Sequence, residues 1–357
     1  MAKTRFVYRY LLALVALLCG TGADAADPAR WVPVSRVTGH LSAADIGLVI
    51  NTADPYSVEV GEYYIEKRHL KPAQVLRLEL PVRSSLGVEE FEQLKAQIDD
   101  HFGTRAQALA FAWVKPYAVQ CQSITGALAL GFDPQLCEQS CGRSKPSPYL
   151  NSASLRPYSD LGVRLSMLLA ATSVGQAKAL IDRGVGADRS LGLRGAPPVN
   201  AYFVSTQDSA RNVRAKLFPP AGPIKRFGVD VKVEEGTGLE GKDRVLLYET
   251  GLVHVPHLDT LGWVNGALAD HLTSFGGLLD KNGGQMNVLA WIDAGATASY
   301  GTVSEPCNHV QKFPHPQLLL QHYLQGSTAI EAYWRSVAWP SQGVFVGEPL
   351  AAPFSRR

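Results

Sequence analysis

The stretch that decides the fold runs from residue 245 to residue 308 and reads VLLYETGLVHVPHLDTLGWVNGALADHLTSFGGLLDKNGGQMNVLAWIDAGATASYGTVSEPCN. Two apolar runs in it, residues 245–248 and 288–292, have the composition of short strands, and a polar, glycine-rich loop follows each. The segment between them, residues 266–279, has the composition of a helix that ends at a pair of glycines. Such alternation predicts a parallel sheet covered by helices. Ligands of open α/β sheets collect beyond the carboxyl ends of the strands, so we expect a site in these loops.

The rest of the chain extends this pattern in both directions. Upstream, apolar runs and helical spacing predict a strand, helix, strand, helix and strand at residues 46–50, 58–68, 75–80, 89–102 and 108–114. Later elements are predicted as helices at 167–182, 316–324 and 328–337, and as strands at 201–205, 229–234 and 344–346. The fold class is therefore α/β, with a mostly parallel sheet between two layers of helices. We expect one domain over residues 41–353, preceded by an extension at 26–40 and interrupted by a cysteine-containing insertion at about 115–161.

The first residues have the features of a signal peptide. Lys3, Arg5 and Arg9 precede the apolar run 11–18, and Ala23-Asp24-Ala25 is a typical cleavage sequence. The run is shorter than the roughly 20 residues that a membrane span needs. We therefore expect cleavage after residue 25, export to the periplasm or the extracellular space, and no membrane span in the mature protein. The formal net charge of +2 gives no reason to expect nucleic acid as a partner.

Export decides how the cysteines are interpreted. Loss of the signal peptide leaves Cys121, Cys137, Cys141 and Cys307, and an even number of cysteines in an oxidising compartment favours disulfides. Three of the four lie within twenty-one residues of a turn-rich segment. We expect one bridge inside this cluster, with Cys307 either free or paired with the remaining member.

Several segments resemble a known family. They are IGLVINTADPYSVEVGEYYI, ALADHLTSFGG, GATASYGTVSEPCN, KFPHP, EAYW and FVGEPLAAPF, and they extend over nearly the whole mature chain. They resemble an uncharacterised family of exported bacterial proteins found in genomes with the PEP-CTERM surface-sorting and exopolysaccharide system. The order of elements, with a late EAYW helix and a final GEPL, also resembles the caspase-like fold of gingipain-type cysteine peptidases. Those peptidases have a His-Gly pair after one strand and a cysteine after the next, whereas this chain has no His-Gly pair.

A cysteine hydrolase is one interpretation of the polar residues in the C-terminal half. Cys307 with His271 or His257 could form a thiolate–imidazolium pair, in which the histidine lowers the thiol pKa and later protonates the leaving group. The structural alternative is a cysteine in a disulfide and a histidine that holds a loop. Asp270, His271 and Ser274 on one helix would have poor geometry for a serine relay.

A metal site is a second interpretation. His254, His257 and Asp259 supply two imidazoles and a carboxylate, which are ligands that zinc accepts. The proline between the two histidines excludes the helical spacing of metalloprotease motifs. The chain contains no dinucleotide or phosphate-loop fingerprint, and we expect no cofactor.

Binding residues are predicted in three loops that should share one edge of the sheet. Asp54 and Ser57 follow the first strand and would also cap the next helix. Thr297 and Ser299 lie in a small-residue loop, and Glu305 is expected to hold that loop against His271. The function predicted from the sequence is an exported, non-catalytic or degenerate caspase-like binding component of the cell envelope, with an envelope protein or peptide as partner. A cysteine hydrolase and a metal-dependent hydrolase remain the alternatives.

Overall fold

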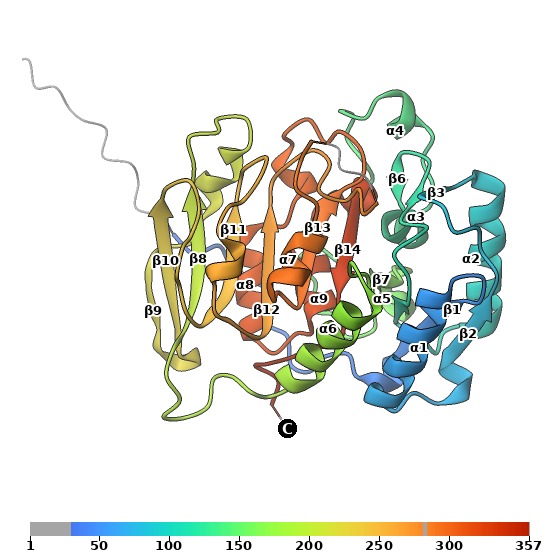
Figure 1. Ribbon diagram of the computed structural model, residues 1–357, viewed down its shortest axis with the longest axis horizontal. Helices are drawn as coiled ribbons and strands as arrows, with labels where there is room; N and C mark the ends of the chain where they lie inside the picture. The colour runs from blue at the N-terminus through green and yellow to red at the C-terminus, as the bar shows by residue number, and fades with distance from the viewer. Residues whose placement is uncertain (1–29, 281–283, 357) are drawn as a thin grey trace, which may run out of the picture.

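Within the described residues, a central sheet of eleven strands extends across the protein (Figure 1). The computed structural model describes residues 30–280 and 284–356, so the predicted signal peptide lies outside the described residues. The order across the sheet is β2-β1-β4-β7-β14-β13-β12-β11-β8-β10-β9. In chain order the strands are β1 (Ile46–Asn51), β2 (Val75–Leu78), β4 (Ala108–Phe111), β7 (Leu165–Leu168), β8 (Val199–Ser205), β9 (Gly222–Ile224), β10 (Val229–Glu235), β11 (Val245–Thr250), β12 (Trp263–His271), β13 (Ala298–Thr302) and β14 (Gly343–Gly347).

The sheet consists of two parallel halves that run in opposite directions. The first half contains β1, β2, β4 and β7, and the second contains β8, β10, β11, β12 and β13. The last strand, β14, lies between the halves, parallel to β7 and antiparallel to β13. The carboxyl ends of β1 and β11 therefore lie at opposite edges. The prediction that loops 51–57 and 252–259 share one edge is wrong, because it assumed a single strand direction throughout.

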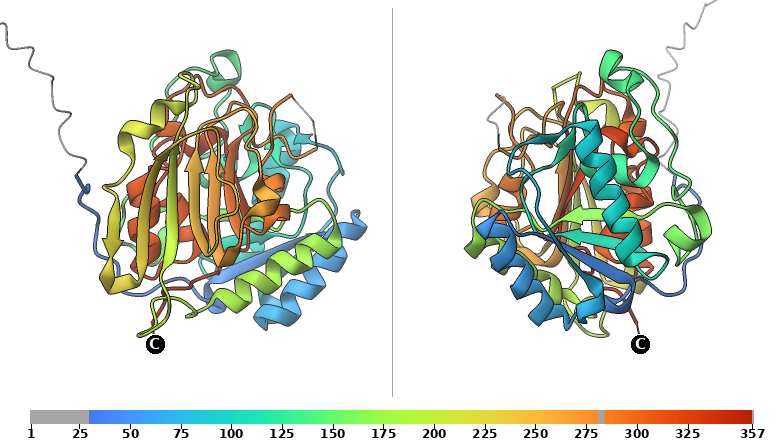
Figure 2. Two further views of the ribbon diagram at one scale, coloured as in Figure 1. Left: turned by 60° about the vertical axis from the view of Figure 1, so that its left-hand side comes forward. Right: turned by 90° about the vertical axis from the view of Figure 1, so that its right-hand side faces the viewer.

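Helices cover both faces of this sheet, which confirms the predicted three-layer α/β fold. Figure 1 shows α1 (Pro55–Arg68), α6 (Val174–Ala187) and α7 (Leu289–Ala294) in front of the sheet, with α8 (Pro316–Leu324) and α9 (Ala329–Trp334) behind it. The remaining long helix, α2 (Val88–Phe102), covers the first half of the sheet. The two layers are also visible edge-on in the right view of Figure 2. All residues of β1, β4, β7, β11 and β14 are buried, as expected for strands covered on both faces.

Local signals explain where the helices begin. The Asp54 side chain accepts a hydrogen bond from the Tyr56 amide and caps α1, and Ser173 caps α6 in the same way through Gln176. Thr328 and Glu331 form a capping box at α9. The predicted capping role of Asp54 is confirmed.

Three predicted elements have the wrong type. Residues 266–279 were predicted as a helix, but they begin with the second half of β12 and continue as a loop. The run 288–292 was predicted as a strand, but it belongs mostly to the six-residue helix α7, and β13 follows it where a loop was expected. Residues 167–182 were predicted as one helix but contain the end of β7 and the start of α6. Strands buried on both faces show no alternation of polar and apolar residues, so short apolar runs are ambiguous.

The segment 115–161 contains three short helices and two of the three strands of a small second sheet. Strands β5 (Ala118–Val119) and β6 (Gln122–Ser123) pair with each other, and β5 also pairs with β3 (Ser85–Leu86). The helix α3 (Ile124–Leu130) packs against β7 and β14 of the central sheet. Part of the segment predicted as an insertion therefore contributes to the main core.

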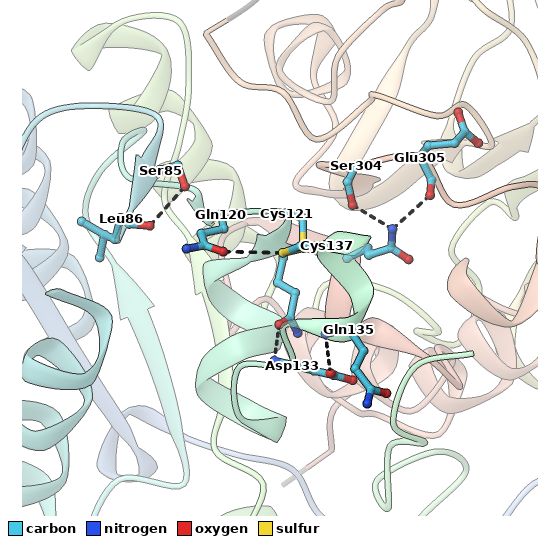
Figure 3. The surroundings of a disulfide bond; sticks show 11 residues. Ser85, Leu86, Gln120, Cys121, Asp133, Gln135, Cys137, Ser304 and Glu305 are labelled. Carbon is cyan, nitrogen blue, oxygen red and sulfur yellow. Dashed lines mark hydrogen bonds between the residues drawn. A yellow bond between two sulfur atoms is a disulfide. The ribbon is translucent and has the colours of Figure 1, made fainter. Parts of the chain in front are cut away.

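All four cysteines of the described residues form disulfides. The Cys121–Cys137 bridge (Figure 3) confirms the predicted bond inside the cluster. Cys141 pairs with Cys307. The second bond connects the segment 115–161 to the loop that follows β13.

Candidate functional site

Cys307, the predicted nucleophile, has its sulfur atom in the bond to Cys141. Its backbone has a positive φ of 56°, and its amide donates to Glu305 Oε1 at 2.7 Å. The sulfur exists as a thiolate only when the disulfide is reduced. The arrangement described here is therefore that of a structural cystine, held in a tight turn by the Glu305 carboxylate.

His271, the first candidate base, is buried in the core under α7. Its Nδ1 accepts a hydrogen bond from Trp291 Nε1 at 2.9 Å, so the neutral ring has its proton on Nε2, which lies 3.1 Å from the Met286 carbonyl oxygen. Burial lowers the pKa of His271 to about 3. The ring is therefore neutral at physiological pH, and both nitrogens are engaged in holding α7 and residue 286 on the sheet.

The predicted metal ligands His254, His257 and Asp259 do not form a metal-binding cluster. His254 Nε2 lies 3.1 Å from the Gly284 carbonyl oxygen, and His257 precedes the short turn that contains Asp259, with a positive φ of 59°. No group of three or more His, Cys, Asp or Glu side chains with metal-binding geometry occurs within residues 30–280 and 284–356.

The five predicted binding residues do not form one site. Ser57 Oγ accepts from the Asn51 amide, and Thr297 Oγ1 accepts from the Gly266 amide, so both hydroxyls hold backbone groups. Ser299 is fully buried, and its hydroxyl has no protein partner among the described residues. Glu305 binds the Cys307 amide, whereas His271 bonds to residues 286 and 291 instead. Of these five, Asp54 lines a cavity.

That cavity lies at the carboxyl ends of β1, β4 and β7. Its volume is about 380 Å³, and its lining includes Asp54, Lys115, Thr172 and Asp280. Lys115 Nζ lies 3.2 Å from Asp280 Oδ2, and the Tyr117 hydroxyl donates to the other carboxylate oxygen at 2.6 Å. These polar groups already satisfy one another, so the cavity offers few free partners to a ligand.

A second polar cluster is buried under α8 and α9. Arg214 Nη1 lies 2.6 Å from Asp270 Oδ1 and 3.8 Å from Glu249 Oε2, and all three side chains are at least 98% buried. Glu249 and Asp270 are register partners at the ends of β11 and β12. Burial raises the pKa of both carboxyl groups, and the Arg214 charge opposes this rise. Asp270 and His271 point to opposite faces of the sheet, as successive strand residues do, so they cannot act as a helical pair.

A larger cavity lies on a different side of the molecule, and we call it the basic groove. Its volume is about 1220 Å³, and it is bounded by the N-terminal segment 31–42, β9 with the following turn, the end of α8 and Arg356. The left view of Figure 2 shows the blue N-terminal segment passing along this side, next to the yellow strands and the red helices. The apolar lining consists mainly of Trp31, Ile224, Phe227 and Leu324, and the charged lining of Arg36, Arg226 and Arg356, with His40 beside them.

The charged side chains that line the groove are all positive. Arg36, Arg226 and Arg356 are exposed, and no aspartate or glutamate belongs to its lining within the described residues. The protein as a whole is nearly balanced, at +2. A cavity lined by one sign of charge concentrates ligands of the opposite sign.

Sequence reasoning missed this groove because four distant segments build it. The N-terminal part was predicted only as an extension, and its Arg36 and His40 had no visible partners. The available signal was the apolar–basic composition of residues 31–42, WVPVSRVTGHLS, which contains no carboxylate.

Comparisons with known proteins assign no activity to this chain. No family model matches the chain, and no curated protein matches it. Among solved structures, the chain is similar to the Arg-specific cysteine proteinase gingipain R, with 12% sequence identity and a TM-score of 0.44 over 90% of this chain and 80% of that chain. No residue role in this chain rests on that likeness.

Proposed function

We propose that the chain is an exported, non-catalytic binding protein. The observation that carries this proposal is the Cys141–Cys307 disulfide, which uses the sulfur of the candidate nucleophile for a covalent link between two loops. A catalytic cysteine must be a thiolate to attack a carbonyl group. Two disulfides are also in keeping with an oxidising compartment, as the signal-peptide pattern predicts.

The histidine candidates support the same interpretation. A general base needs a free ring nitrogen and a pKa near the working pH. His271 has neither, because the indole of Trp291 and the Met286 carbonyl occupy its nitrogens and burial lowers its pKa to about 3. Its role is therefore to position α7 against β12.

The decisive experiment removes the disulfide partner of Cys307 and leaves Cys307 itself unchanged. Cys141→Ser leaves the Cys307 thiol unpaired, and the double variant Cys121→Ser/Cys137→Ser is the matched control that opens the other disulfide. We expect neither protein to hydrolyse a pool of fluorogenic peptides, with or without reductant. We also expect iodoacetamide to label Cys307 in Cys141→Ser no faster than an ordinary exposed thiol.

Hydrolysis by Cys141→Ser that is absent from Cys141→Ser/Cys307→Ser would overturn the proposal. It would identify the disulfide as the lock on a cysteine hydrolase. Circular dichroism and thermal unfolding of each variant confirm that the fold is intact before activity is compared.

A further inference from the structure

We propose that the basic groove binds an extended, acidic polypeptide segment of a partner protein. This proposal rests on the binding role proposed above and names the site and the ligand chemistry for it. Three features of the groove support this ligand: its positive charge, its apolar floor and its walls of extended backbone.

The charge favours carboxylates. Arg36, Arg226 and Arg356 line the groove, and none of them forms an ion pair with another described residue. Some arginines elsewhere in the described residues do form ion pairs, as Arg68 does with Glu348 and Arg335 with Glu331. A guanidinium group carries its charge at every physiological pH and matches the geometry of a carboxylate with two parallel hydrogen bonds. Three unpaired arginines without a lining carboxylate therefore fit acidic side chains spaced along a ligand.

The floor of the groove favours apolar side chains between the acidic ones. Trp31 is 38% exposed, and Ile224 and Phe227 are only partly buried. Leu324 continues this surface into the core. Successive side chains of an extended chain point to opposite sides. A ligand with alternating acidic and apolar residues would therefore place its acidic side chains on the arginines and its apolar side chains on this floor.

The helix α8 already recognises an extended backbone beside the groove. Gln317 Oε1 accepts from the Val32 amide at 2.7 Å, and Gln321 Nε2 donates to the Val32 carbonyl at 3.1 Å. One turn further on, Gln325 Oε1 accepts from the Val37 amide at 2.9 Å and its Nε2 donates to the Ser35 carbonyl at 3.2 Å. We call this series the glutamine ladder. It fixes the N-terminal segment as an extended wall of the groove.

The opposite wall is the outer strand of the sheet. Strand β9 pairs only with β10 within the described residues, and its Pro223 and Ile224 line the groove. An unpaired strand edge favours extended polypeptide over a compact small molecule. The cavity of about 1220 Å³ also exceeds the range of roughly 300–1,000 Å³ that is usual for small-molecule sites.

The test is a binding measurement with the processed chain. The probe is a fluorescein-labelled octapeptide of alternating Glu and Leu, and the control peptides carry Gln or Lys in place of Glu. We expect the Glu peptide to bind at least tenfold more tightly than the Gln peptide, and its affinity to fall as salt rises. We expect Arg36→Gln and Arg226→Gln each to weaken binding about tenfold, since charge-assisted hydrogen bonds are lost.

The matched control is Arg77→Gln, which removes an exposed arginine on β2 at the opposite end of the sheet. Its affinity should equal that of the unaltered protein. Equal affinities for the three peptides, or equal losses in Arg77→Gln and Arg226→Gln, would overturn the proposal. Binding of dodecanoate at the arginines without binding of the Glu peptide would overturn it as well. These results are independent of the hydrolysis assay, so each proposal fails separately.

Discussion

Glu249 is the most unusual single residue in the core. Its carboxyl group is fully buried, and neither oxygen has a hydrogen-bond partner among the described residues. Burial raises its pKa well above the usual value, and the neighbouring Asp270 adds to the rise. The folded protein therefore holds a proton on this group more tightly than the unfolded chain does.

The linkage between proton binding and folding gives this residue a pH-dependent effect. A carboxyl group with a raised pKa contributes stability that is full below the unfolded pKa of about 4.3 and is lost as pH rises through the folded pKa. Glu249→Gln keeps the shape of the neutral acid and removes the ionisation. We expect Glu249→Gln to be about 1–3 kcal/mol more stable than the original protein at pH 8, with a smaller gain at pH 5. Urea unfolding at both pH values measures this difference.

Asp270→Asn is the matched comparison, because it removes the carboxylate that lies 2.6 Å from Arg214 Nη1. Loss of that partner leaves the buried guanidinium poorly compensated, so we expect a loss of about 3–5 kcal/mol. Equal effects of the two substitutions would show that the two carboxyl groups share one role, contrary to this account.

At the scale of elements, the glutamine ladder makes a prediction about local order. Gln325→Ala removes the acceptor of the Val37 amide, whereas the Val32 amide keeps its bond to Gln317. We expect hydrogen exchange at Val37 to accelerate at least tenfold, while exchange at Val32 and in the core strands stays the same. Exchange measured residue by residue by NMR checks this. Equal acceleration at both amides would mean that the segment detaches as one unit.

Prediction from sequence succeeded where an element has one clear signal. The run at β1, the capped helix α1 and the apolar face of α2 were predicted at nearly their observed bounds. It failed at β12 and α7, where small apolar residues fit either type of structure. Gly266 in β12 shows the physical reason: a Cβ there would lie 2.9 Å from the Ala187 side chain and 3.1 Å from the Tyr323 hydroxyl, so tertiary packing selects this residue. Local propensity carries no information about such a contact.

The candidate site was less predictable than the fold. The chemistry of Cys307 was recognised, including the alternative of a disulfide with the remaining cysteine. Asp54 and His257 lie at different edges of the sheet because the strands before them run in opposite directions. The change of direction occurs between β14 and β13, which are antiparallel. The basic groove depends on residues 31–42 meeting α8 and β9, a contact that no local pattern indicates.

At the scale of the whole molecule, the two disulfides should differ in their contribution to stability. Cys121–Cys137 closes a sequence separation of 16 residues, and Cys141–Cys307 one of 166. Loop-closure entropy assigns them about 3 and about 5 kcal/mol. We therefore expect Cys141→Ala/Cys307→Ala to lower the free energy of unfolding by about 2 kcal/mol more than Cys121→Ala/Cys137→Ala does. Denaturant titration of the two double variants tests this, and a larger loss from the shorter loop would contradict it.

No described helix is long and apolar enough to cross a membrane. Two groups of charged residues stand out in the described residues: the arginines of the basic groove and the buried cluster around Arg214.

The position of β14 has a consequence for how the chain is made. This strand contains residues 343–347 of 357, yet it fills the middle of the sheet, and Glu348 directly after it is clamped by Arg68 of α1. During synthesis from the amino end, the ribosome releases this strand after every other strand of the central sheet. Until then β7 and β13 expose unpaired inner edges, which are prone to associate with other chains. The nascent chain therefore cannot close its sheet until all the preceding strands have been made, so the two halves wait for the strand that joins them.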